Sequence, residues 1–254
     1  MLARERQNVI VEMVNKEGSV LVKELSEKFD VTEDSIRKDL SLLEKKGLLK
    51  KTYGGAMKIR VNTHELYVSQ RRGKNIKAKQ SIAKNAFELI EEGDVIFLDI
   101  STSNIELIKL IIEENLKVTV VSNMVDVMLS FTKPTETKLI FIGGKLNRGR
   151  DGFIGSTTNK QIAEFKFDKA FMGVVGVDIN TKKVYTYAMD DALTKQAIME
   201  SAGQTYMMLE KRKLSKDGNY RYANIDDFEG VVLDEMPDET ILEKLKNENL
   251  EVYY

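Results

Sequence analysis

The sequence of 254 residues predicts an α/β protein with two domains: a small, mostly helical N-terminal domain and a larger C-terminal domain around a mainly parallel sheet. Two patterns predict this division. Apolar residues recur at helical spacing in the first part of the chain, which ends in a short basic hairpin. From Lys74 onward, short apolar strands alternate with amphipathic helices, as in βαβ units. We expect the domains at residues 1–58 and 74–254, with a linker at 59–73.

The N-terminal domain is predicted to contain three short helices before the hairpin. The first two are expected at residues 4–14 and 22–29. The third begins after Thr32, whose hydroxyl can cap it, and Glu33 and Asp34 favour the positive end of its dipole. Its apolar residues recur at i, i+4 and i+7 and therefore share one face: Ile36, Leu40 and Leu43. Three short helices followed by a basic hairpin form the pattern of a winged helix-turn-helix domain.

Basic and hydroxyl side chains mark the other side of this third helix and the hairpin. Between Arg37 and Lys58 the chain carries seven Lys or Arg against two acids. Such a face suits the major groove of DNA, because Arg and hydroxyls reach base edges and Lys neutralises phosphates. A solvated helix face is the plainer interpretation of charge alone, and the helical pattern around it is what favours DNA. The candidate DNA-binding residues are Thr32, Ser35, Arg37, Lys38, Ser41, Lys45, Lys50, Lys51 and Tyr53.

The composition excludes several classes of site. The chain has no Cys and one His, so disulfides, thiolate or His-rich metal sites and a His-dependent catalytic triad are excluded within one chain. That residue, His64, falls in the expected linker, where a surface role is the ordinary explanation. No cofactor is indicated. Since no apolar run approaches 18 residues and the N-terminus lacks a signal peptide's apolar region, we expect a cytoplasmic protein without membrane contact.

The C-terminal domain is predicted to alternate strands and helices along its length. Apolar strands are expected at 94–99, 117–122, 138–144, 168–176, 205–210, 230–235 and 250–254. Amphipathic helices are expected at 76–91, 104–114, 124–131, 155–165, 190–202 and 238–247. This order predicts a mainly parallel sheet, in which ligands bind outside the carboxyl ends of the strands.

Polar residues and glycines collect at three of those strand ends. The first strand ends at Asp99 and leads through Ser-Thr-Ser, residues 101–103, into a helix. Free N–H groups, hydroxyls and a helix dipole at that point suit a phosphate. The second strand ends in Ser-Asn at 122–123, and the third in Gly-Gly at 143–144, where missing side chains would let a ligand approach the backbone. Taken singly, each is an ordinary cap or turn, but three coincident strand ends favour a ligand site.

At several of these positions the sequence resembles that of the DeoR family of bacterial transcriptional regulators. The resemblance rests on the runs Ser35-Ile36-Arg37-Lys38-Asp39-Leu40, Tyr53-Gly54-Gly55-Ala56, Phe97-Leu98-Asp99, Ser122-Asn123 and Asp168-Lys169-Ala170-Phe171-Met172-Gly173. Lys38 stands where the family has Arg, Tyr53 where it has His, and Ser101 where it has Gly. The resemblance implies an effector domain similar in fold to ribose-5-phosphate isomerase and CoA-transferases, with a phosphorylated sugar as effector.

The strand ends and the resemblance together give the candidate effector-binding residues. They are Asp99, Ser101, Thr102, Ser103, Ser122, Asn123, Gly143, Gly144, Asp190, Lys195 and Lys213. Carried over from the family, Lys195, Lys213 and the 101–103 loop would hold the phosphate. Carboxylates and amides among the others would hold the sugar hydroxyls.

The function expected from the resemblance is a repressor of sugar-catabolism genes that binds double-stranded operator DNA and is controlled by a phosphorylated sugar. The alternative is an enzyme, a sugar-phosphate isomerase with an appended DNA-binding domain, because Asp99, Asp190 and Lys195 could move protons between sugar carbons. A constitutive architectural DNA-binder would leave the second domain without a role. Because one short helix contacts few base pairs, we expect a homodimer or homotetramer.

Overall fold

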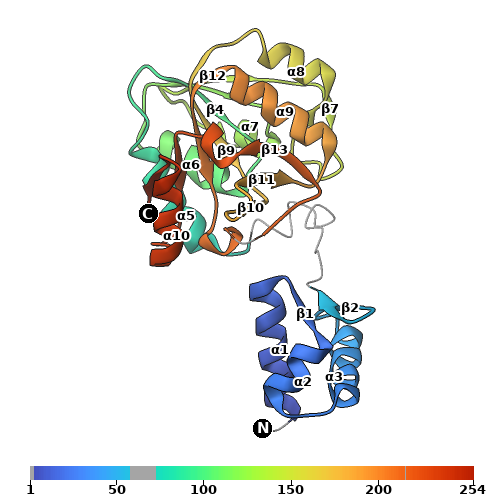
Figure 1. The fold of residues 1–254 in the computed structure, drawn as a ribbon. Helices are drawn as coiled ribbons and strands as arrows, with labels where there is room; N and C mark the ends of the chain where they lie inside the picture. The colour runs from blue at the N-terminus through green and yellow to red at the C-terminus, as the bar shows by residue number, and fades with distance from the viewer. Residues whose placement is uncertain (1–2, 58–72, 215) are drawn as a thin grey trace. The chain divides into compact units, whose positions relative to one another are not determined.

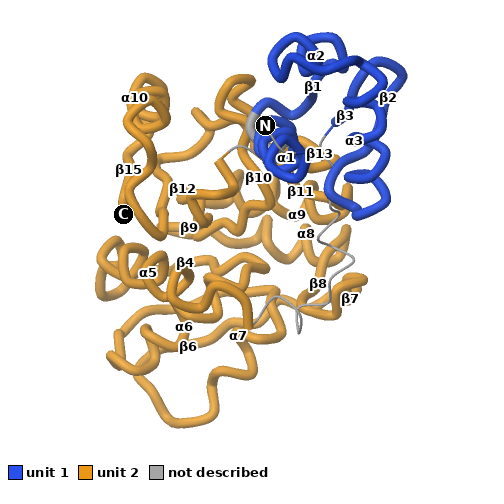
Figure 2. The backbone as a smooth tube through the Cα atoms, turned by 90° about the horizontal axis from the view of Figure 1, so that it is seen from below, with its two compact units in different colours: residues 1–61 blue, residues 62–254 orange. Residues whose placement is uncertain are grey.

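The computed structural model describes residues 3–57, 73–214 and 216–254 (Figure 1). The chain forms two compact units, residues 1–61 and 62–254, which are described separately (Figure 2). The expected linker at 59–73, with His64, lies outside the described residues except for Gly73. The expected domain limits therefore stay a prediction.

The first unit contains three helices and a small antiparallel sheet. These elements are α1 (Ala3–Glu17), β1 (Ser19–Leu21), α2 (Val22–Phe29), α3 (Glu33–Lys45), β2 (Lys50–Thr52) and β3 (Gly55–Met57). The strand order is β1-β3-β2, so β1 adds a strand that periodicity did not indicate. The helices close over one core that includes Ile10, Leu25, Ile36 and Leu40. This arrangement confirms the predicted winged helix-turn-helix fold.

The hairpin, or wing, needs glycine where it meets the helical part. β3 lies so close to β1 that a Cβ on Gly55 would stand 1.9 Å from the backbone oxygen of Val20. One residue earlier, the backbone oxygen of Gly54 accepts from Val22 N at 2.8 Å. The glycine pair therefore joins the wing to the start of α2.

The second unit is built on a seven-stranded sheet in which every pair of neighbouring strands is parallel. From one edge to the other, its strands are β15 (Glu251–Tyr253), β14 (Gly230–Val232), β12 (Ala202–Met208), β9 (Phe167–Gly173), β4 (Val95–Leu98), β5 (Thr119–Ser122) and β6 (Lys138–Phe141). Each predicted strand overlaps one of these, and the predicted parallel sheet is confirmed.

One predicted strand, at 168–176, is wrong in its last three residues. β9 ends at Gly173, and the chain continues into a separate antiparallel sheet of order β10-β11-β13. The strands of that sheet are β10 (Gly176–Asp178), β11 (Lys183–Thr186) and β13 (Tyr220–Asn224). β9 loses β4 as a partner beyond Phe171, because the N–H and C=O of Gly173 bond to the side chains of Asp99 and Lys195.

Helices cover both faces of the large sheet (Figure 1). They are α5 (Ile76–Phe87), α6 (Thr102–Glu113) and α7 (Val125–Ser130) on one face, and α8 (Ser156–Ile162), α9 (Met189–Glu200) and α10 (Glu239–Asn247) on the other. Adjacent strand residues point to opposite faces, so Leu98 packs with Ile82 and Leu107 while Phe97 packs with Ile198. All six predicted helices are present. The sequence did not indicate the short strands β7 (Lys145–Leu146) and β8 (Phe153–Ile154) or the single-turn helices Lys211–Lys213 and Ile225–Asp227.

Within residues 3–57, 73–214 and 216–254, no helix combines the length and the apolar character needed to cross a bilayer.

Candidate nucleic-acid interface and effector site

A buried carboxylate fixes α3 against α1. Asp39 is 5% exposed and accepts hydrogen bonds from Arg6 Nε and Gln7 Nε2, each 2.7 Å long. Both carboxylate oxygens therefore have donors, as a buried charge requires. Asp39 is a positioning residue that orients α3, whereas the sequence placed it only within a family motif.

The exposed face of α3 carries both predicted recognition cations. Arg37 donates to Glu33 Oε2 at 2.6 Å, and Lys38 Nζ lies 2.8 Å from Asp34 Oδ2. All four side chains are exposed. We expected the two acids to act on the helix dipole, but each also pairs with the cation one turn later. The i, i+4 spacing of opposite charges is the signal that could have revealed these pairs.

Three of the predicted hydroxyl residues are engaged within the domain. Thr32 caps α3, as predicted, by accepting from Ser35 N at 3.3 Å, and the hydroxyls of Thr32 and Ser35 lie 2.9 Å apart. Ser41 Oγ donates to Arg37 O and accepts from Lys51 Nζ, both at 2.7 Å. These hydroxyls thus have local roles, and their contacts to DNA stay a prediction.

The wing is tied to α3 and surrounded by exposed cations. Lys51 N donates to Glu44 Oε1 at 2.8 Å, which adds to the contact between the Lys51 ammonium and Ser41. The sequence analysis did not single out Lys46, which is exposed next to the end of α3. The exposed residues of this region that could donate to a phosphate include Lys45, Lys46, Lys50 and Tyr53.

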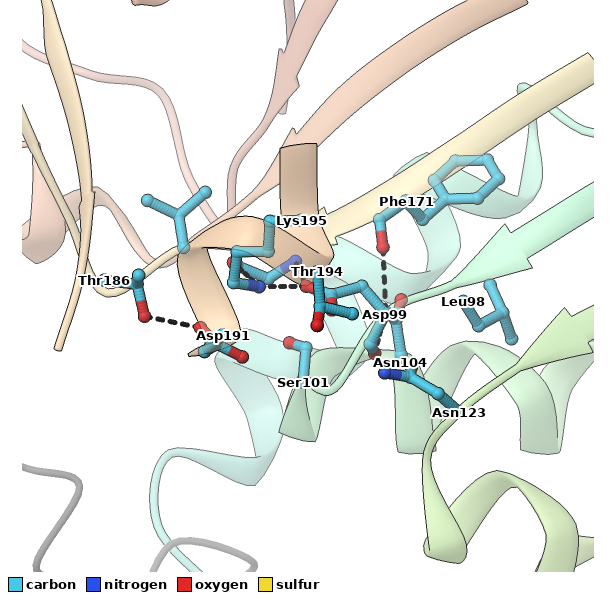
Figure 3. A network of polar contacts seen from close by, with 12 residues as sticks. Leu98, Asp99, Ser101, Asn104, Asn123, Phe171, Thr186, Asp191, Thr194 and Lys195 are labelled. Carbon is cyan, nitrogen blue, oxygen red and sulfur yellow. Dashed lines mark hydrogen bonds and ion pairs between the residues drawn. The ribbon is translucent and has the colours of Figure 1, made fainter. Parts of the chain in front are cut away.

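In the second unit, Asp99 and Lys195 meet as a buried ion pair (Figure 3). Asp99 follows β4 and is 1% exposed, and Lys195 comes from α9 and is 3% exposed. The peptide of Gly173 bonds to both: its N–H donates to Asp99 Oδ2 and its C=O accepts from Lys195 Nζ, each at 2.9 Å. The structure brings these two predicted residues together, but it presents neither charge to solvent.

The surrounding charges keep Lys195 protonated. Burial opposes its positive charge, but the carboxylates of Asp99 and Asp191 outweigh burial and raise the pKa of Lys195 above its ordinary value. The ammonium also lies 5.6 Å from the centre of the Tyr222 ring. Burial raises the pKa of Tyr222, so its hydroxyl stays neutral. Lys195 is therefore a charged internal link between α9 and the ends of β4 and β9.

The Ser-Thr-Ser loop forms the N-terminus of α6. Ser101 is the N-cap, with its Oγ accepting from Ser103 N at 3.2 Å, and the helix starts at Thr102, two residues earlier than predicted. Asn104 is fully buried and donates to one backbone oxygen just after β4 and one in β9, at 2.7 and 2.9 Å. The sequence analysis missed Asn104. The loop has the backbone geometry of an anion site, although its Ser101 hydroxyl is engaged in capping.

The second predicted strand end is buried as well. Ser122 Oγ donates to a backbone oxygen of β4 at 2.7 Å and accepts from Met124 N at 3.1 Å. Asn123 is fully buried, and its Nδ2 donates to Phe153 O at 2.7 Å. In the described part of the chain, the Oδ1 atoms of Asn123 and Asn104 accept no hydrogen bond. A buried acceptor without a donor costs about 1–3 kcal/mol, so each is a candidate for a ligand's hydroxyl.

Gly144 allows the close approach of α8, and its neighbour Gly143 contributes a backbone oxygen to that contact. Thr158 Oγ1 donates to Gly143 O at 3.0 Å, and a Cβ on Gly144 would stand 2.1 Å from the same hydroxyl oxygen. Gly144 also has a φ of +148°, which side chains rarely allow. Gly144 thus has a packing role that needs no ligand, whereas a Cβ on Gly143 would meet no atom within 4 Å among the described residues.

The remaining predicted residues divide between surface and interior. Asp190, in the first turn of α9, is exposed and lies 3.5 Å from Lys145 Nζ. Its neighbour Asp191 turns inward and accepts from Thr186 Oγ1 at 2.5 Å (Figure 3). Lys213 Nζ donates to a backbone oxygen just after β9, at 2.9 Å. Asp190 was named from the family resemblance, which matches both adjacent acids, and the structure places Asp191 rather than Asp190 toward the core.

Two family models match the chain. The DeoR-like helix-turn-helix domain matches residues 6–61, and the DeoR C terminal sensor domain matches residues 74–235. A Bacillus subtilis protein described as the HTH-type transcriptional regulator YulB is 30% identical over 99% of this chain and 96% of its own length. The lactose phosphotransferase system repressor of Staphylococcus epidermidis is 29% identical over 91% of each chain. Among solved structures, a ribose 5-phosphate isomerase A from Methanocaldococcus jannaschii has 19% identity and a TM-score of 0.39, covering 54% of this chain and 53% of that one.

The family models fall on both units, and the relatives that align along most of the chain are named as regulators. They match a regulator rather than the isomerase-like enzyme considered as the alternative. The helix-turn-helix unit is the DNA-binding part. The chain belongs to the DeoR family of transcriptional regulators.

Proposed function

We propose that this protein is a cytoplasmic repressor of sugar-catabolism genes whose DNA affinity is changed by a phosphorylated sugar bound in the second unit. The observation that carries the proposal is the helix N-terminus at residues 101–103. It lies at the carboxyl edge of a parallel sheet, in a unit that matches the family's sensor domain. The relative named as a lactose phosphotransferase system repressor supports a role linked to sugars.

At the DNA, α3 is the helix proposed to enter the major groove. Arg37 and Lys38 are the residues proposed to reach base edges, because they lie on the exposed face of that helix. Lys45, Lys50 and Tyr53 are proposed to contact phosphates, which fixes the register of the protein without reading the sequence. The residues proposed to shape this surface through internal contacts are Thr32, Ser35, Ser41 and Lys51.

Specific DNA binding is proposed to need more than one copy of the chain. A single recognition helix covers few base pairs, so a homodimer or homotetramer would read two half-sites about 10 bp apart or a multiple of that. Light scattering at operator-binding concentrations tests this, and a strict monomer there would contradict it.

In the second unit, the phosphate is proposed to bind the first turn of α6. Free backbone N–H groups and the positive end of the helix dipole meet at Thr102, which is half-buried. The buried Oδ1 atoms of Asn104 and Asn123, which follow the first two strand ends, suit hydroxyl groups of the sugar.

Asp99 and Lys195 are proposed to act one step away from the ligand. Their ion pair holds the peptide of Gly173. A Cβ on Gly173 would stand 2.5 Å from Ser101 Cβ, so Gly173 lies directly against the loop at residues 101–103. Both are therefore proposed as positioning residues rather than phosphate ligands. Asp190 and Lys213 remain proposed contacts at the edge of the site, on the strength of the resemblance alone.

A sugar-phosphate screen on the full chain tests the proposal. Thermal shift with pentose and hexose phosphates identifies the ligand, and calorimetric titration then compares wild type with Thr102→Glu and Thr157→Glu. Thr102→Glu places a negative charge where the phosphate is proposed, while Thr157 is an exposed residue in the first turn of α8 and serves as the matched control. We expect a loss of affinity of about tenfold or more in Thr102→Glu alone. Equal affinity in all three proteins would place the ligand elsewhere.

A further inference from the structure

The cations of the DNA-binding surface fall into two groups. Arg37 and Lys38 are each held by a carboxylate one turn back on α3, at 2.6 and 2.8 Å. In contrast, three cations at the end of α3 and on the wing have no carboxylate partner among the described residues: Lys45, Lys46 and Lys50. A fourth, Lys51, is held by the hydroxyl of Ser41. The paired group is therefore the one at the start of the recognition helix, and the unpaired group follows it.

We propose that Glu33 and Asp34 are specificity-determining residues for DNA binding. They hold Arg37 and Lys38 until base edges replace the carboxylates, so these two cations contribute little to binding of unrelated sequences. The unpaired lysines supply the sequence-independent attraction.

The physical basis is the difference between a phosphate and a base edge as a partner for Arg37. A phosphate offers a cation roughly what a carboxylate already offers, and the phosphate is also repelled by Glu33 and Asp34. A guanine edge offers Arg a bidentate contact in a fixed geometry. Because the pairs are exposed, they are weak enough for such a contact to displace them. Glu33 and Asp34 therefore lower the affinity for unrelated DNA more than they lower the affinity for the operator.

Asp34 stays charged under physiological conditions, as the proposal needs of it. The hydrogen bond from Lys38 lowers the pKa of Asp34, and the same bond raises the pKa of Lys38. The lowered pKa means that Asp34 releases Lys38 to a competing partner rather than through protonation.

A different role for the acids makes a different prediction. Acids in the first turn stabilise a helix through its dipole. If that were their whole role, neutralising them would loosen α3 and weaken binding to all DNA alike.

The test uses the full chain and two duplexes of equal length, one selected from random DNA by the wild-type protein and one with the same bases scrambled. Glu33→Gln/Asp34→Asn is compared with wild type by titration between 50 and 300 mM salt. Each released cation that neutralises a phosphate contributes about fivefold at 0.15 M salt and steepens the salt slope by about 0.9. For the scrambled duplex we expect a gain of roughly tenfold or more and a salt slope steeper by up to about 2. Affinity for the selected duplex should rise much less, so the ratio of the two affinities falls.

The matched control is Glu12→Gln/Glu17→Gln, which removes two exposed acids from α1 and changes net charge by the same amount. An equal fall in the affinity ratio for this control would show that bulk charge is responsible and overturn the proposal. An unchanged ratio in the α3 variant would overturn it too. So would a parallel fall of both affinities together with lower helicity by circular dichroism, which would leave helix stabilisation as the role of the two acids.

Discussion

Neutralising Lys195 tests the buried ion pair of the second unit. Lys195→Met keeps the length of the side chain but leaves Asp99, 1% exposed, without a cation. Removing one partner of a buried pair costs about 3–5 kcal/mol, a large share of the roughly 5–15 kcal/mol by which proteins are typically stable. Asp99→Asn leaves the opposite charge unpaired, and we expect a loss of similar size. In the double variant neither charge remains, so its cost should be at least about 2 kcal/mol below the sum of the singles.

Urea unfolding followed by tyrosine fluorescence measures these differences in the second unit. The chain has no Trp, and seven of its nine Tyr lie between Tyr185 and Tyr254, so the signal comes mainly from that unit. Lys109→Met is the matched control, because Lys109 is exposed and pairs with Glu106 at 2.8 Å. We expect it to cost less than about 1 kcal/mol. Additive costs in the double variant, or a Lys195→Met protein as stable as wild type, would refute the reasoning.

Three further predictions concern the first unit. Asp39→Ala removes the two hydrogen bonds that Asp39 accepts, and should lower the free energy of unfolding by about 2–4 kcal/mol in urea unfolding. The same variant should bind all DNA more weakly when titrated with a duplex. Arg37→Ala should cost about 1–3 kcal/mol of operator affinity and relax the sequence preference. Lys50→Ala should instead weaken binding to all sequences alike and reduce the salt slope by about 1. Identical specificity profiles for the two variants would contradict this. Gly55→Ala places a Cβ 1.9 Å from Val20 O and should destabilise the wing, which a lower melting temperature would report; an unchanged one would argue against this packing.

Periodicity was enough to predict most elements of the fold. Ile36, Leu40 and Leu43 share the buried face of α3 as their spacing required, and Thr32 caps that helix. Each apolar run predicted as a strand of the second unit overlaps a strand of the large sheet, because a strand buried on both faces needs a continuous run of apolar residues. These features depend on residues close in sequence, which is why a single chain reveals them.

The features that the sequence did not reveal depend on contacts between distant residues. The run ending at Gly176 looks like one strand, yet it divides at Gly173, whose peptide is taken by side chains from two other elements. Likewise, Lys195 has the spacing of a surface helix residue, and its burial follows from Asp99, which is 96 positions away in the chain. At Gly144 the need for glycine has two causes, a positive φ and the close approach of Thr158 from α8.

The burial of Asp99 and Lys195 changes how the effector site should be tested. The resemblance placed Asp99 and Lys195 at the ligand, but the structure gives them a stabilising role that their removal would also destroy. Loss of the effector response in variants of these two residues would therefore not identify a ligand contact. Thr102 is half-buried in the first turn of α6, and among the described residues its side chain forms no ion pair, so it gives the cleaner test.

The most direct test of the central claim is the affinity of the sugar phosphate for the free protein and for the protein saturated with operator DNA. If the sugar controls DNA binding from the second unit, linkage requires that operator DNA changes the affinity for the sugar by the same factor as the sugar changes the affinity for the operator. For coupled sites this factor is typically about 5–150-fold. Calorimetric titration of both states should give dissociation constants that differ by the factor measured independently in operator titrations with and without the sugar. Equal sugar affinities in the two states would contradict the account, because a ligand that does not distinguish two states cannot shift their equilibrium.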